Sequence, residues 1–371
     1  MSRARDFADL AGSADAGGLT GRNLIINGAM QVAQRATSAS AKSSAGYHVV
    51  DRFRFVNNTS TGAVDIEQST TVPAGQGFGY SLKVSTSTAK ATLTGTNEFG
   101  IQHRMEGQNL QLLNYGTSSA SKATLSFWVR SNKTGTYVVW LYQTGNNRNI
   151  QKQFTISSAD TWEKKELTID GDTSGSLAND NSNELEFFIV LGTGPDRSSG
   201  TAPTAWETLD NADRYVGQTV NILDSTSNTF YLTGVQLEVG EQATPFEHRS
   251  FGDELARCQR YCYVRGGEGV YELFMLATAN GSATCTGVVQ APVKMRTRPT
   301  HSISSTAHID LYDFDGSAHR TLSGSGTLVS SIASSSYIYI DWTTSGVTSG
   351  ANMMVRANNT TDARFTLDAE L

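Results

Sequence analysis

Leu185-Glu186-Phe187-Phe188-Ile189-Val190-Leu191 is the stretch that decides the fold class, because an extended chain with this sequence is apolar on both faces. Its β-branched and aromatic residues favour a strand, and its length is typical of one. Tyr137-Val138-Val139-Trp140-Leu141-Tyr142 has the same character. We therefore expect both segments to be central strands of a β-sandwich and to be the most deeply buried ones.

Similar strand-like runs, separated by clusters of Gly, Asn, Asp, Ser and Thr, extend from residue 22 to residue 249. In residues 125–130, one strand face reads Leu, Phe and Val, and the other ends in a charge. Residues 230–239 form a long run of β-formers in which Gly234 predicts a bulge. We expect this strand to close a first β-sandwich domain over residues 22–249.

One short linking helix is predicted over residues 250–263. Ser250 and Asp253 resemble a capping box, which favours a helix start at this point. Apolar side chains follow at alternating spacings of four and three residues, as in a coiled-coil seam: Phe251, Leu255, Cys258 and Cys262. The helix is expected either to form a short seam between copies of the chain or to pack against its own domain.

A second, smaller β-sandwich is predicted over residues 264–371. Strand-like runs resume there at residues 287–293, 337–342, 353–356 and 364–367. Residues 1–21 are small and polar and cannot bury a core alone, so we interpret them as a tail. A chain of 371 residues is long for one core, which agrees with two domains. The predicted fold class is all-β.

The composition excludes several classes of protein. Only 17% of the residues are charged and the net charge is -6, so we expect no nucleic-acid partner, because neutralising phosphates needs clustered Lys and Arg. The first residues lack a secretory signal, and no apolar run approaches transmembrane length. We expect a soluble protein, made in a cytoplasm, with no membrane partner and with three reduced cysteines.

The sequence carries no local signature of catalysis, so we predict no enzymatic activity and no cofactor. It lacks a Gly-x-Ser-x-Gly elbow, a His-Glu-x-x-His motif and a phosphate-binding loop, and its six histidines have no metal-ligand spacing. Glu184 and Glu186 share one strand face and would serve a glycosidase only if another carboxylate opposed them across a groove. We interpret them as part of a solvated face.

Two acidic segments partly resemble calcium sites. Asp310-x-x-Asp313-x-Asp315-Gly316 lacks the closing Glu of a calcium loop and is interpreted as a hairpin turn. The segment from Asp170 to Asn183 is rich in side-chain oxygen and could hold calcium, but Asp and Asn also favour turns. We predict no metal site in either segment.

Aromatic residues are the better indication of a binding site. The five tryptophans lie among Tyr, Asn and Gln, which are the residue types that stack on sugar rings and hydrogen-bond hydroxyl groups. Most tryptophans are core residues, but Trp206 lies in a segment, Thr201-Ala202-Pro203-Thr204-Ala205-Trp206-Glu207, that is typical of a loop. We therefore predict Trp206 as the ligand-binding residue.

Four segments together resemble a galactose-binding-like jelly roll, as found in carbohydrate-binding modules: residues 79–84, 123–131, 161–165 and 230–238. The resemblance covers about half of the chain and implies a jelly-roll sandwich for the first domain. Many such modules carry an acidic pair on the final strand, where this chain has Thr233-Gly234. That departure argues against their structural calcium site.

A second resemblance covers most of the chain and is to tail-fibre-like and other virion-surface proteins of bacteriophages. The segments that carry it are residues 1–6, 23–32, 244–250, 254–261 and 368–371. It implies a virion-docking N-terminus, attachment to other tail or head proteins, assembly as a homotrimer and a location on the virion surface. It supplies no catalytic residues.

The sequence therefore favours a phage tail fibre or adhesin that binds a host surface receptor, expected to be a glycan. The alternative is a purely architectural head fibre or tail adaptor without a glycan site. A depolymerase is a third class, but the sequence shows neither an acid pair nor a long β-helical repeat.

Overall fold

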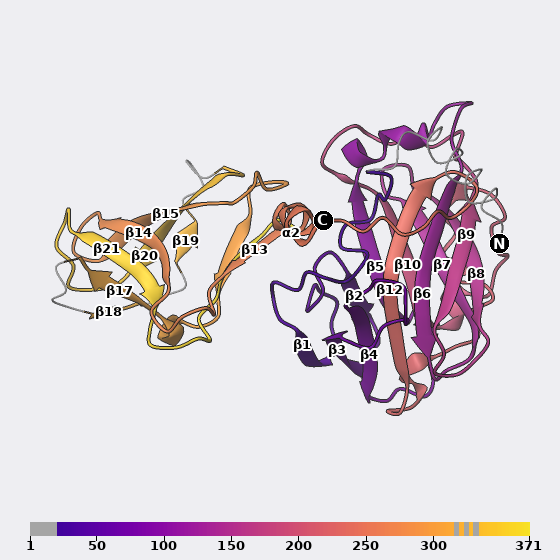
Figure 1. Cartoon of the computed structure of the whole chain (residues 1–371), viewed down its shortest axis with the longest axis horizontal. Helices are drawn as coiled ribbons and strands as arrows, with labels where there is room; N and C mark the ends of the chain where they lie inside the picture. The colour runs from indigo at the N-terminus through magenta and orange to yellow at the C-terminus, as the bar shows by residue number, and fades with distance from the viewer. Residues whose placement is uncertain (1–20, 315–318, 323–325, 329–333) are drawn as a thin grey trace. The chain divides into compact units, whose positions relative to one another are not determined.

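The structure is a computed structural model that describes residues 21–314, 319–322, 326–328 and 334–371. Residues 1–20 of the predicted tail lie outside the described residues, as do Asp315 and Gly316 of the predicted turn. The chain forms two compact units, one up to Glu254 together with Leu371 and one from Leu255 to Glu370 (Figure 1). In the described part of the chain, no helix is long and apolar enough to span a bilayer.

Two six-stranded antiparallel sheets form the first unit (Figure 1). Sheet A contains, in spatial order, β1 (Ser38–Lys42), β3 (Ala63–Ser69), β4 (Ser81–Thr88), β12 (Thr229–Val239), β6 (Ala123–Ser131) and β9 (Glu163–Ile169). Sheet B contains β11 (Glu207–Thr208), β8 (Arg148–Ile156), β7 (Gly135–Gln143), β10 (Asn183–Thr193), β5 (Glu98–Glu106) and β2 (Arg54–Asn57). This arrangement confirms the predicted N-terminal sandwich.

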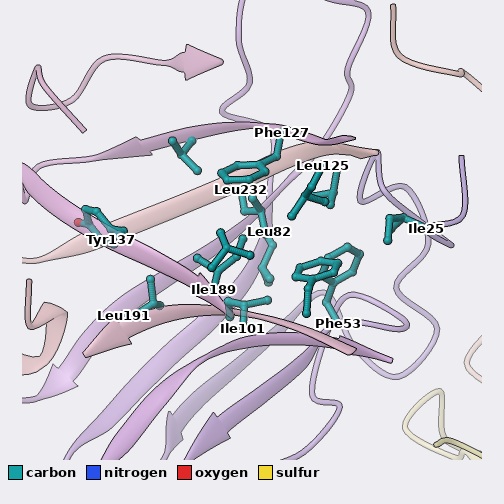
Figure 2. Packing of buried hydrophobic residues seen from close by; sticks show 14 of the residues in the cluster. Ile25, Phe53, Leu82, Ile101, Leu125, Phe127, Tyr137, Ile189, Leu191 and Leu232 are labelled. Carbon is teal, nitrogen blue, oxygen red and sulfur yellow. The ribbon is translucent and has the colours of Figure 1, made fainter. Parts of the chain in front are cut away.

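The core of the first unit lies between the two sheets. Phe127 and Leu232 point inward from sheet A, and Ile101 and Ile189 point inward from sheet B (Figure 2). A second apolar cluster, on the outer face of sheet B, contains Val138, Trp140, Phe188, Val190 and Tyr215. Strands β7 and β10 are therefore buried on both sides, as the sequence predicts for them.

Gly234 produces the predicted bulge in β12. Its φ is +62°, and the pairing of β12 with β6 shifts register between Thr233 and Gln236. A Cβ atom at residue 234 would lie 2.6 Å from the ring of Phe78, so a larger residue would require the neighbouring ring to move.

Helix α2 spans Phe251–Gln259 and is shorter than the helix predicted over residues 250–263. Cys262 lies instead on a strand, where it pairs with Asp368. Cys258 and Cys262 are both fully buried. The prediction of a continuous helical seam that includes residue 262 was therefore wrong, because strand pairing takes up the backbone of this residue.

The second unit contains two smaller antiparallel sheets, which confirms the predicted C-terminal sandwich. Sheet C contains β13 (Cys262–Arg265), β22 (Phe365–Asp368) and β16 (Thr300–Ile303). Sheet D contains β18 (His319–Thr321), β17 (Ile309–Asp313), β21 (Asn352–Ala357), β14 (Leu273–Ala279), β15 (Thr284–Gln290), β20 (Tyr337–Thr343) and β19 (Thr327–Leu328). One cluster of buried side chains, including Trp342, Phe274 and Phe365, fills the core of this unit.

Two segments that are far apart in sequence are joined by a buried polar cluster, which we call the clasp. The Glu247 carboxylate accepts a hydrogen bond from the Asn23 amide at 2.7 Å, and Glu254 accepts one from the Asn27 amide at 2.7 Å. Arg249 lies 3.5 Å from Glu254, and their side chains are only 7% and 6% exposed. The clasp therefore holds the beginning of the first unit against its end.

The charges of the clasp stabilise one another. Burial would raise the pKa of the Glu247 carboxyl, but hydrogen bonds from the amides of Asn23 and Gly21, together with Arg249, outweigh this effect and lower it. A carboxylate with a lowered pKa stabilises the fold above its unfolded-state pKa, and this contribution is lost as the pH falls through the folded-state pKa.

Replacing Arg249 with Ala should lower the free energy of unfolding of the first unit by about 3–5 kcal/mol, because the change leaves buried carboxylates without their cation. Denaturant unfolding of the full chain measures this loss. Arg257→Ala, at an exposed position of α2, is the control and should change the free energy by less than about 0.5 kcal/mol. Equal effects of the two substitutions would contradict the role of the clasp.

His103 is a second buried polar residue of the first unit. It is fully buried, its Nε2 accepts a hydrogen bond from the Ile26 amide at 3.3 Å, and its ring stacks on Phe53 with centroids 5.2 Å apart. Burial, and then the nearby Arg52 guanidinium, lower the pKa of His103 well below its usual value. The imidazole is therefore neutral in the folded protein at neutral pH.

The first unit should lose stability as the pH falls below about 6.5, because the unfolded chain then binds a proton on His103 that the folded chain does not. His103 contributes at most about 1.4 kcal/mol per pH unit to the slope of the free energy of unfolding against pH. His103→Gln keeps a hydrogen-bonding side chain but does not titrate, so its free energy of unfolding should lack this part of the slope. Denaturant unfolding at pH 5 to 8 tests this, and an unchanged slope in the variant would contradict it.

Candidate functional site

Trp206 does not lie on an exposed loop surface, so the reason for selecting it was wrong. The side chain is 8% exposed and belongs to the core cluster of the first unit. Its indole Nε1 donates a hydrogen bond to the Asp170 carbonyl at 2.7 Å, and its ring meets Tyr115 edge to face at 5.7 Å. The loop-like composition of residues 201–207 gave no signal of these partners. The role of Trp206 as a ligand contact stays a prediction.

The backbone of Trp206 is held by a network at the end of sheet B. Arg148 donates to the Trp206 carbonyl at 2.8 Å and to both oxygens of the Asp172 carboxylate, at 2.6 and 3.0 Å. Gln143 also donates to Asp172 at 2.9 Å. Burial opposes ionisation of Asp172, but these bonds and those from backbone amides outweigh it and lower its pKa.

The oxygen-rich segment from Asp170 to Asn183 uses its carboxylates within the protein. Asp172 is bound by Arg148 as described, and Asp180 accepts a hydrogen bond from the Ser182 amide at 2.8 Å. Across residues 21–314, 319–322, 326–328 and 334–371, no group of three or more His, Cys, Asp or Glu side chains is placed to hold a metal ion.

Replacing Trp206 with Ala should destabilise the first unit by about 3–5 kcal/mol, because it removes a buried indole and leaves a cavity beside Tyr115. Trp162→Ala is the matched control, since Trp162 is only half-buried and should cost less. Denaturant unfolding measures both. A smaller loss for Trp206 than for Trp162 would show that Trp206 is not needed for packing.

The outer face of sheet B carries a row of polar and aromatic side chains across five neighbouring strands. We call this set the Tyr142 row, and the strand register places its members side by side: Arg104 on β5, Glu186 on β10, Tyr142 on β7, Asn149 on β8 and Glu207 on β11. Successive residues of a strand point to opposite faces, and Phe187 and Leu141 point into the core. The Tyr142 row therefore faces away from it.

An adjoining part of the same face is closed. Trp140 is 3% exposed because the Arg214 guanidinium lies over its ring at 4.1 Å and Tyr215 meets its edge at 6.0 Å. Its indole nitrogen donates to Asn149 at 2.9 Å. Trp140 therefore supports its neighbours, and its ring is not available to stack on a ligand.

Tyr142 is half-buried, whereas Trp140, Phe188 and Tyr215 on the same face are buried. Its ring stacks on Trp140 with centroids 4.9 Å apart and an interplanar angle of 11°, and its hydroxyl donates to Asn147 at 3.0 Å. Burial, and then the Glu186 carboxylate, raise the pKa of Tyr142, so the phenol is neutral at physiological pH. The ring is held in one orientation by its neighbour.

Charged groups lie beside Tyr142 in fixed positions. The Arg104 guanidinium is 3.2 Å from the Glu186 carboxylate, and Asn183 donates to the same carboxylate at 3.2 Å. Burial, and then the carboxylates of Asp213 and Asp210, raise the pKa of Glu207 at the other end of the row. Within the row, Glu186 is 6% exposed and Asn149 is fully buried, so the members that a ligand can reach are the half-buried ones: Arg104, Tyr142 and Glu207.

Sequence reasoning missed the Tyr142 row. It identified residues 137–142 as a strand buried on both sides. As the ligand-binding residue it selected Trp206, in the loop-like segment of residues 201–207, instead. A signal was present, because Tyr142 ends the apolar run and is followed by Gln143 and Thr144. Tyr is also the aromatic residue with a polar group suited to a partly wet position.

Comparisons with known proteins give distant structural similarities. No protein-family model matches the sequence, and no curated protein matches it. The enzymatically active domain of tailspike protein 4 from bacteriophage CBA120 aligns at a TM-score of 0.30 and 10% identity, over 59% of this chain and 21% of that one.

Carbohydrate-binding modules are also found. TmCBM61 in complex with β-1,4-galactotriose aligns at a TM-score of 0.30 and 10% identity, over 59% of this chain and 99% of that one. The family 11 module of Clostridium thermocellum with a mixed-linked tetrasaccharide aligns at a TM-score of 0.28 and 11% identity, over 57% and 98%. The all-β fold class rests on the sheets of the chain itself.

Proposed function

We propose that the protein is a virion-surface fibre or adhesin whose jelly roll binds a host glycan through the Tyr142 row. The observation that carries this proposal is the half-buried Tyr142 ring, stacked on Trp140 and flanked by the Arg104–Glu186 ion pair. A sugar presents C–H faces to an aromatic ring and hydroxyl groups to nearby donors and acceptors. A neutral phenol and an internally paired charge suit a neutral ligand of this kind.

The resemblance to phage fibre proteins supports the proposed location on the particle. Three of the segments that carry the resemblance contribute the clasp, namely residues 23–32, 244–250 and 254–261. In this proposal the first 21 residues attach the protein to other tail or head proteins, and the assembled form is a homotrimer.

Binding is the only chemistry proposed. Glu186, the acidic member of the row next to Tyr142, is paired with Arg104 and hydrogen-bonded by Asn183. A retaining glycosidase needs two carboxyl groups about 5 Å apart across the substrate, one of them free to give a proton. An ion-paired carboxylate suits the orientation of a ligand better than proton transfer. We therefore propose a non-enzymatic protein.

Replacing Tyr142 with Ala should weaken glycan binding by about 1 kcal/mol or more, which is roughly fivefold or more in Kd, because it removes the stacking surface. A glycan array identifies the ligand, and titration of that ligand gives the Kd. Tyr80→Ala, at a tyrosine that is 38% exposed in the same unit, is the control and should bind normally. Binding should be unaffected by EDTA.

Unchanged binding by the folded Tyr142→Ala variant would remove the Tyr142 row from the glycan site. If the purified protein binds no glycan on the array and does not block adsorption of particles to host cells, the architectural alternative is favoured instead. Binding that is lost in EDTA would point to a metal-dependent site elsewhere in the chain.

A further inference from the structure

Large apolar residues are exposed on the outer face of sheet D in the second unit. Leu276 is 54% exposed, Val288 is 41% exposed and Tyr337 is 50% exposed. The solvated face of an antiparallel sheet is normally polar, and exposed apolar patches of a few hundred Å² mark interaction surfaces. These side chains do not belong to the core, which lies on the opposite face of the same strands.

The strand register places Leu276 and Val288 in one row with three further apolar or aromatic residues of this face. Met354 pairs with Leu276 and also with Tyr312, and Val288 pairs with Tyr339. Ala277 pairs with Gly287 in two antiparallel strands, so the neighbouring residues Leu276 and Val288 lie opposite each other. The row therefore crosses five neighbouring strands of sheet D, in this order: Tyr312, Met354, Leu276, Val288 and Tyr339.

The charged groups beside this row have partners within the same unit. Asp310 is bound by Arg356 at 3.2 Å and by His319, and the Arg356 guanidinium lies over the Tyr312 ring at 3.9 Å. At the other side of the row, Asp341 accepts a hydrogen bond from Thr286. An ionic partner would have to compete with these internal partners, whereas an apolar surface of another copy would not.

The residues at the centre of the row favour a protein partner over a sugar. Leu276 and Val288 have neither a flat ring for stacking nor a hydrogen-bonding group, and both are needed to bind a glycan. Five strands spaced by about 4.8 Å give a face roughly 24 Å wide. A band six residues long covers on the order of 500 Å² per partner, or about 1,000 Å² in total, which is at the lower limit of a specific interface.

We propose that the outer face of sheet D is the surface through which copies of this chain contact one another. Cys258 and Cys262 are buried within their own chain, which leaves Phe251 and Leu255 as the accessible residues of the predicted seam, and the sheet D face supplies a further apolar surface. This inference concerns assembly, so it stands or falls separately from the glycan site on the first unit.

The test is the mass of the full-length protein, measured by light scattering and sedimentation at 1 to 50 µM. The wild-type chain should be a multimer, and the double variant Leu276→Lys with Val288→Lys should be a monomer, because it buries charge in the contact. Leu112→Lys is the matched control, since Leu112 is 43% exposed on the first unit, and its mass should equal that of the wild type.

A wild-type monomer at 50 µM, or a double variant that keeps the multimer mass, would overturn the proposal. Loss of the multimer in Leu112→Lys as well would also overturn it. Thermal unfolding shows whether the double variant is folded, and Leu276→Thr with Val288→Thr, which keeps β-formers in both strands, repeats the test if it is not. Glycan binding, measured on the same variants, should equal that of the wild type.

Discussion

The burial of β7 and β10 on both sides is the constraint on which the rest of the first unit depends. One side of these strands packs into the core between the sheets, and the other side must also be covered. The segment that includes Arg214 and Tyr215 covers it as far as Trp140. Tyr142 lies two residues along β7 from Trp140 and stacks on its ring, so the candidate site lies directly beside this cover.

The strands with the clearest apolar or β-forming runs could be predicted from sequence, because their signals are local. Apolar residues on both faces identified β7 and β10, and the glycine inside a run of β-formers identified the bulge of β12. The beginning of α2 was also local, since the Ser250 hydroxyl accepts a hydrogen bond from the Asp253 amide at 3.2 Å. The end of α2 could not be predicted from local signals, because Cys262 pairs with Asp368, more than 100 residues later in the sequence.

The environment of individual side chains could not be predicted in the same way. Trp206 has a loop-like sequence around it, but the Asp170 carbonyl and Arg148 make its position a buried one. The partners of Glu247 and Glu254 lie more than 220 residues away in the sequence. Each of these contacts depends on how the sheets assemble, and no spacing within one segment encodes it.

The clasp also determines how the first unit responds to mechanical force. A pull applied between Asn23 and Glu254 acts first on the hydrogen bonds that join these two ends directly, which are those from the Asn23 and Asn27 amides to Glu247 and Glu254 and that from Arg249 to the Ile25 carbonyl. The strands of both sheets bear the force only after those bonds break. The clasp therefore protects the sandwich from the first part of the load. A domain held in this way can transmit tension along the chain while its two sheets keep their shape.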